Sequence, residues 1–146
     1  MRRRVLRVLL ATSLAAAACG KPADPVRAAL DRMADAAHAR DAAAVMAQVS
    51  ADFQAADGSS RADDEALLRR YFAAYEILDV RLEDVRIERS ENTARVRLRA
   101  VMSGRPRQVG GLSGLLPSSA TYDFDLRMSH DGGSWKVAWG SWNQAE

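Results

Sequence analysis

The sequence predicts an α+β domain in which three N-terminal helices pack on a curved antiparallel sheet of about four long strands. Apolar residues recur at helical spacing up to about residue 75, and they alternate with polar residues from residue 77 onward. Helices followed by strands are typical of a fold in which the helices cover one face of an antiparallel sheet. The chain has a single cysteine, so no disulfide can form within it and the core alone must stabilise the fold.

The first part of the domain is expected to form two helices. A helix over about 25–39 is predicted by apolar positions at helical spacing, which are Val26, Ala29, Leu30, Met33 and Ala37. Asp41 suits the N-cap of a shorter second helix. The apolar face of that second helix holds Val45, Met46 and Val49.

A third helix is predicted from about Ala62 to Tyr75. Acidic residues stand at its N-terminal end, where the helix dipole favours negative charge. One face of this helix carries Leu67, Leu68, Tyr71, Phe72 and Tyr75. The preceding stretch, Ser50–Ser60, contains Asp57-Gly58 and is expected to be a loop or a short hairpin.

Four strands are predicted after Ile77. The first changes phase at Glu83-Asp84, as a β-bulge would cause, and the second and third alternate regularly. Asp131-Gly132-Gly133 is a tight-turn signal before a last strand over Ser134–Trp142. In that strand, alternation places Trp135 and Trp139 on one face and Trp142 on the other, so Trp142 is expected to be the more exposed aromatic.

The N-terminus predicts export. Residues 1–18 combine a basic start, a short apolar core and small residues at the end, which are the three parts of a secretory signal peptide. The apolar stretch is shorter than the roughly 20 residues that a permanent membrane-spanning helix needs. We therefore expect residues 1–18 to be a signal peptide, residues 19–25 a tether, and residues 26–143 the folded domain.

Cys19 follows this segment directly. Ala16-Ala17-Ala18-Cys19-Gly20 resembles a lipobox, which implies diacylglycerol attachment to Cys19, although Ala16 stands where that pattern prefers Leu, Val or Ile. There are two alternatives. The segment is cleaved in the ordinary way and leaves a free thiol on Cys19, or the segment is not processed. By resemblance to Gram-negative lipoproteins, Gly20 after the cysteine implies the outer membrane, with the domain facing the periplasm.

Processing also changes the charge of the chain. The sequence has 21 basic and 19 acidic side chains. Four of the arginines lie in residues 1–18, so the mature part keeps 17 basic against 19 acidic side chains. No basic surplus remains, and we expect no nucleic-acid partner.

The order of helices and strands resembles the nuclear transport factor 2-like superfamily, which includes SnoaL-like domains. The resemblance covers roughly Val26 to Trp142 and includes Ala39-Arg40-Asp41, Asp52-Phe53 and the closing stretch Gly132 to Val137. It implies a cone whose pocket lies between the concave sheet face and the helices. The superfamily includes isomerases, dehydratases, ligand binders and interaction modules, so the fold alone does not choose among them.

Candidate ligand-binding residues fall into two groups. Tyr71, Tyr75 and Tyr122 are polar aromatics on faces expected to point into the cone, although aromatics at this spacing are usually core. Leu112, Leu115 and Leu116 lie in Ser103–Ser119, a glycine-hinged segment that either covers the cone's mouth, docks a partner or packs under the helices.

No catalytic residues are predicted. His38 and His130 are far apart in sequence and lack neighbours at metal-ligand spacing, so both are expected at the surface, without a metal or other cofactor. Asp79 lies where the ketosteroid isomerase branch places its general base, but its flanking residues do not match that motif.

The opposite sheet face is expected to be charged and solvated. Arg95, Arg97 and Arg99 should face Asp123, Asp125 and Arg127 if the second and third strands pair. Such a face leaves the oligomeric state open between a monomer and a polar dimer. The sequence thus predicts a non-enzymatic envelope lipoprotein that binds a small apolar ligand or an envelope protein, and a SnoaL-like isomerase, dehydratase or hydrolase is the alternative.

Overall fold

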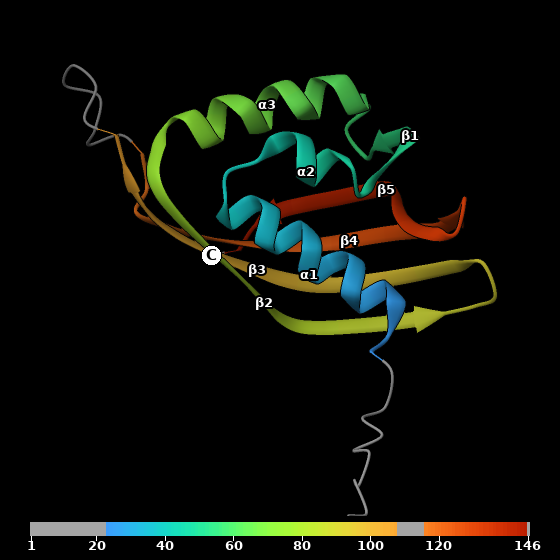
Figure 1. The fold of residues 1–146 in the computed structure, drawn as a ribbon. Helices are drawn as coiled ribbons and strands as arrows, with labels where there is room; N and C mark the ends of the chain where they lie inside the picture. Colours follow the sequence, from blue (N-terminus) through green and yellow to red (C-terminus); the bar gives the residue numbers. More distant parts are fainter. Residues whose placement is uncertain (1–22, 108–115, 146) are drawn as a thin grey trace, which may run out of the picture.

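The predicted α+β class is confirmed by a computed structural model, which describes residues 23–107 and 116–145 (Figure 1). Three helices lie on one face of a single twisted sheet. The helices are α1 (Pro25–His38), α2 (Ala42–Met46) and α3 (Arg61–Ala73). The strands are β1 (Val49–Ala55), β2 (Tyr75–Arg89), β3 (Thr93–Pro106), β4 (Ser119–Asp131) and β5 (Ser134–Gln144).

Side-chain caps fix where each helix begins. Asp24 accepts a hydrogen bond from the backbone N–H of Val26 at 2.8 Å at the start of α1. Asp41 caps α2, as predicted, by accepting from the N–H of Ala44 at 2.9 Å. Ser60 and Asp63 form a reciprocal capping box on α3. The third helix ends two residues before its predicted end because Tyr75 is already the first residue of β2.

The sheet has five strands in the order β1-β5-β4-β3-β2, one more than predicted. The prediction of a loop or hairpin over Ser50–Ser60 is wrong for its first half, because β1 pairs in parallel with β5. The other neighbouring strands pair antiparallel. After β1 the chain does turn, with Gly58 in the left-handed region at φ 88°.

Register shifts interrupt the strand pairing at several places, and two of them bear on the sequence prediction. The predicted bulge in β2 is confirmed: the register with β3 shifts between Glu83 and Arg86, and Asp84 has φ 50°. A second irregularity, between Arg127 and Met128, was not predicted. Such bulges increase the local twist and bend the strand.

The second bulge changes which tryptophan faces the core. Val137 lies opposite Met128, whereas Trp139 lies opposite Arg127, so one residue of β5 is skipped and the alternation reverses. Trp142 therefore lies opposite Phe124 on the core face, and Trp139 joins the outer face. The prediction that Trp139 shares a face with Trp135, and that Trp142 lies on the other face, is wrong.

The core lies between the helices and the concave sheet face. Its larger cluster joins α1 to the middle of β3, β4 and β5, and Val26 and Val96 are fully buried in it. A smaller cluster joins α2 and the end of α3 to the start of β2, around Phe72, Tyr75 and Leu78. No helix in the described parts of the chain is long and apolar enough to span a bilayer.

The outer sheet face carries the predicted charge ladder. Arg95 pairs with Asp125 at 2.7 Å and Arg99 pairs with Asp123 at 3.0 Å. The guanidinium of Arg127 stacks on the Trp139 ring, 4.7 Å from its centroid. The predicted pairing of the second and third strands is thus confirmed, and the interactions leave this face polar and partly exposed.

Candidate ligand-binding site

The structure brings together the three tyrosines that the sequence singled out. Tyr71 comes from the last turn of α3 and Tyr75 from the first position of β2, and their ring centroids lie 5.0 Å apart. Tyr75 is only 1% exposed, and its hydroxyl donates a hydrogen bond to the carbonyl oxygen of Pro117 at 2.7 Å. We call Tyr71, Tyr75 and Tyr122 the tyrosine cluster.

Tyr122 reaches the cluster from β4 and extends it into an aromatic row. Its ring centroid lies 6.5 Å from that of Phe124, which in turn lies 6.2 Å from that of Trp142. Tyr122 and Phe124 are alternate residues of β4, and Trp142 lies opposite Phe124 on β5, so all three lie on the concave face. Each of them is only half-buried. Half-buried aromatic surface on the concave face of the sheet is suited to contact with an apolar ligand.

The hydroxyl of Tyr71 lies in a protected setting. Burial raises its pKa above the ordinary value of 10.0, and hydrogen bonding with Tyr75 and the proximity of the Tyr75 and Tyr122 hydroxyls raise the pKa further. Tyr71 is therefore protonated at neutral pH. The cluster supplies phenol hydroxyls beside aromatic faces.

The raised pKa of Tyr71 makes stability depend on pH in the alkaline range. Above pH 10, the unfolded chain releases the Tyr71 proton while the folded protein retains it, so the free energy of unfolding falls as pH rises. Urea unfolding at increasing pH should show this loss, and Tyr71→Phe should reduce it. An identical pH dependence in the variant would show that Tyr71 titrates normally.

Of the other predicted binding residues, the structure describes only Leu116. Cys19, Leu112 and Leu115 lie outside the described residues. Leu116 is half-buried and packs against the smaller core cluster, where it meets the group around Phe72 and Tyr75. For Leu116, packing under the helices is therefore the interpretation that the structure supports.

The sequence did not predict a contact between His38 and Asp79. His38, at the end of α1, lies with Nδ1 3.2 Å from Oδ1 of Asp79 on β2. Both side chains are well exposed, at 60% and 45%, and Asp79 also lies 3.8 Å from Arg81. Asp79 alternates with the core residues Leu78 and Val80, so it does not point into the cone as a general base would.

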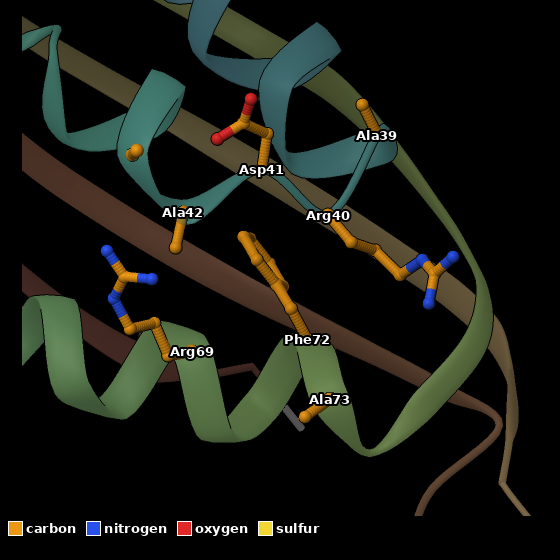
Figure 2. A pocket seen from close by; sticks show the side chains of 8 residues that line it. Ala39, Arg40, Asp41, Ala42, Arg69, Phe72 and Ala73 are labelled. Atoms are coloured by element: carbon orange, nitrogen blue, oxygen red, sulfur yellow. The ribbon is translucent and has the colours of Figure 1, made fainter.

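Two surface depressions lie outside the tyrosine cluster. A groove of about 530 Å³ separates the α1–α2 turn from α3, and Figure 2 shows the Phe72 ring pointing from α3 toward that turn. Arg40 in this turn has φ 57° and donates to the Tyr75 carbonyl oxygen at 2.7 Å. Arg69, across the groove, pairs with Glu65 at 2.6 Å. The local sequence did not reveal this groove, because it depends on how α3 packs.

The second depression lies at the opposite end of the sheet from the tyrosine cluster. It has a volume of about 410 Å³ and is lined by the β2–β3 turn together with His130 and Trp135. The His130 ring packs on Trp135 with centroids 5.4 Å apart. In the part of the chain that the structure describes, no three His, Cys, Asp or Glu side chains gather as a metal site would require.

Comparison with known proteins supports the fold. No family model matches the sequence, and no curated protein matches it. Among solved structures, a candidate scytalone dehydratase from Novosphingobium aromaticivorans DSM 12444 is 12% identical with a TM-score of 0.70, over 84% of this chain and 83% of that one.

Two further structures agree with the first. A candidate dehydratase of the NTF2-like family from Streptomyces avermitilis is 12% identical with a TM-score of 0.68, over 84% of this chain and 95% of that one. An NTF2-like protein of unknown function from Pseudomonas putida KT2440 is 14% identical with a TM-score of 0.64, over 81% and 82% of the two chains. The chain therefore has the nuclear transport factor 2-like fold.

Proposed function

We propose that this protein is an exported, lipid-anchored domain that binds a small apolar ligand at the tyrosine cluster. The observation that carries the proposal is the convergence of three tyrosines from α3, β2 and β4 beside half-buried aromatic side chains on the concave face. An apolar surface with a few convergent polar groups is the usual composition of a small-molecule site.

The chemistry of the cluster indicates the class of ligand. Tyr122, Phe124 and Trp142 offer ring faces and edges, which favour a flat apolar or aromatic molecule. The Tyr122 hydroxyl can donate one hydrogen bond, which favours an acceptor oxygen on that molecule. The ligand that fits best is therefore an aromatic ring bearing a carbonyl, hydroxyl or acidic oxygen.

Catalysis is the second candidate function. Two of the similar structures carry the name of candidate dehydratases. A dehydratase needs a general base beside the bound substrate. Tyr71 has a raised pKa and is therefore a poor base at neutral pH. The groups that influence its hydroxyl among the described residues, Tyr75 and Tyr122, are phenols and supply no carboxylate or imidazole base. The cluster is better suited to binding than to proton abstraction.

A fluorescent probe tests the binding proposal. We expect 1-anilinonaphthalene-8-sulfonate, an aromatic molecule with acceptor oxygens, to bind the mature domain with saturable 1:1 stoichiometry. Tyr122→Ala should weaken binding about tenfold, because an aromatic contact contributes about 0.5–1.5 kcal/mol beyond its buried area. Trp139→Ala is the matched control, since Trp139 lies on the outer face and should leave the affinity unchanged.

Two results would contradict the binding proposal. One is the absence of saturable binding to a protein whose circular dichroism shows it folded. The other is equal affinity of the Tyr122→Ala and Trp139→Ala variants, which would place the probe away from the tyrosine cluster.

The anchor is supported by the N-terminal sequence. A basic start, an apolar core and small residues precede Cys19, and Gly20 follows it, which favours the outer membrane with the domain facing the periplasm. An acylated cysteine gains about 0.8 kcal/mol per buried CH₂, so several chains hold a domain firmly. Metabolic labelling with a palmitate analogue should be lost in Cys19→Ala, and equal labelling of the two proteins would rule out this anchor.

A further inference from the structure

We propose that the end of the domain beside its N-terminus faces the membrane and binds the headgroup of phosphatidylethanolamine. We call this surface the tip, and it comprises Asp24, the β2–β3 turn over 89–92, His130 and Trp135. The inference rests on the proposed lipid anchor at Cys19. It adds an orientation and a second ligand surface, distinct from the tyrosine cluster.

The tether between Cys19 and α1 is short. From Cys19 to Asp24 the chain advances five residues, which span at most about 18 Å when fully extended. Asp24, the N-cap of α1, belongs to the tip, because its carboxylate lies 3.7 Å from the Arg89 guanidinium at the end of β2. A lipid on Cys19 therefore holds the tip within reach of the headgroup layer.

The tip and the tyrosine cluster lie at opposite ends of the sheet. Strand β3 runs from the tip at Thr93 to the tyrosine cluster, where Pro106 lies opposite Tyr75, and its 14 residues extend about 40 Å. Figure 1 shows the start of α1 beside the β2–β3 turn and far from the start of β2. If the tip pointed away from the bilayer, the tether would have to span the domain, and about 18 Å is too short for that. The tip is therefore the end that lies near the bilayer.

The tip combines basic and acidic side chains around a cleft. Its cleft of about 410 Å³ is large enough for a headgroup, and it presents charges of both signs within one turn. The Arg89 guanidinium suits a phosphate, to which His130 can also donate, while the Glu91 carboxylate can accept from a primary ammonium group. Phosphoethanolamine carries both of these groups and matches this pair of charges.

Two labelled positions test the orientation. The lipidated full chain is incorporated into vesicles of phosphatidylethanolamine and phosphatidylglycerol that contain an acceptor dye on the headgroup. A donor dye is attached at Ser90→Cys in the tip or at Ser118→Cys beside the tyrosine cluster, and both serines are exposed. We expect stronger energy transfer from position 90 than from position 118, because the two ends of the domain are about 40 Å apart.

A charge reversal tests the headgroup contact. Arg89→Glu should lower the energy transfer from position 90 and increase the rotational freedom of its dye, because the carboxylate repels the lipid phosphate. Arg81→Glu is the matched control: Arg81 is 65% exposed on the same strand but outside the tip, and its reversal should change neither readout. Equal effects of the two reversals would overturn the headgroup contact.

The outcomes separate this inference from the proposed function. If the chain floats with the vesicles but positions 90 and 118 transfer energy equally, or 118 transfers more, the orientation is overturned while the anchor stands. If the chain does not float with the vesicles and its mass shows no diacylglycerol, the anchor fails and this inference fails with it. Binding of 1-anilinonaphthalene-8-sulfonate at the tyrosine cluster is independent of both results.

Discussion

Replacing Leu30 with alanine should lower the free energy of unfolding by about 2–5 kcal/mol. Leu30 is 2% exposed and lies on the face of α1 that meets the concave sheet, in the larger core cluster. Its removal deletes buried apolar contacts and leaves a cavity between α1 and the sheet, which the paired strands are too rigid to fill. Because α1 covers the sheet, this change tests whether the helix layer holds the cone together.

Leu67→Ala is the matched control for this experiment. Leu67 is also a helical leucine, on α3, but it is 49% exposed. Its truncation should change the free energy of unfolding by no more than about 0.5 kcal/mol. Urea unfolding followed by circular dichroism measures both variants. Similar losses in the two would mean that α1 does not pack on the sheet as described.

Most of the fold could be predicted because its elements have regular local patterns. The helices followed from apolar spacing and from the cap at Asp41, and β3 and β4 followed from unbroken alternation. β1 was missed because its burial does not alternate strictly and because it contains Ala and Asp, which have low strand propensity. Its partner, β5, lies more than 80 residues away, so only the tertiary fold reveals the pairing.

The site could be predicted in part for the same reason. Tyr71 and Tyr75 share a face through their spacing, and Tyr122 follows from alternation in β4, so all three were identified from sequence. The role of Trp142 was misjudged because the bulge that reverses the β5 alternation arises in its pairing with β4. The contact between His38 and Asp79 joins a helix end to a strand, and local patterns do not encode such contacts.

Replacing Gly104 with alanine should destabilise the protein and disturb the tyrosine cluster together. A Cβ at this position would lie 2.5 Å from the backbone oxygen of Ile77 and 3.0 Å from Cδ1 of Tyr75. Strand pairing opposite Leu78 holds that backbone oxygen in place, so β2 and β3 must separate to admit the methyl group. Overpacking of this kind costs about 1–3 kcal/mol.

The consequence for the site follows from two hydrogen bonds at the same end of the sheet. The Gly104 N–H donates to the carbonyl oxygen of Ser118 at 2.9 Å, and the Tyr75 hydroxyl donates to that of Pro117 at 2.7 Å. Separation of the strands displaces both donors relative to their acceptors. We therefore expect Gly104→Ala to weaken 1-anilinonaphthalene-8-sulfonate binding as well as stability, whereas Leu30→Ala lowers stability from a position away from the cluster.

Gly140→Ala is the matched comparison, because it adds the same methyl group to another strand glycine. Its Cβ would meet Cδ2 of Leu126 at 3.2 Å, which is the movable end of a side chain, and no backbone atom. The backbone entropy that alanine removes from the unfolded chain stabilises by about 0.4–1 kcal/mol and offsets much of that contact. Urea unfolding should therefore rank Gly104→Ala well below Gly140→Ala in stability. If Gly104→Ala were the more stable variant, the backbone of β2 would have to lie farther from Gly104 than the 2.5 Å contact with the Ile77 oxygen implies.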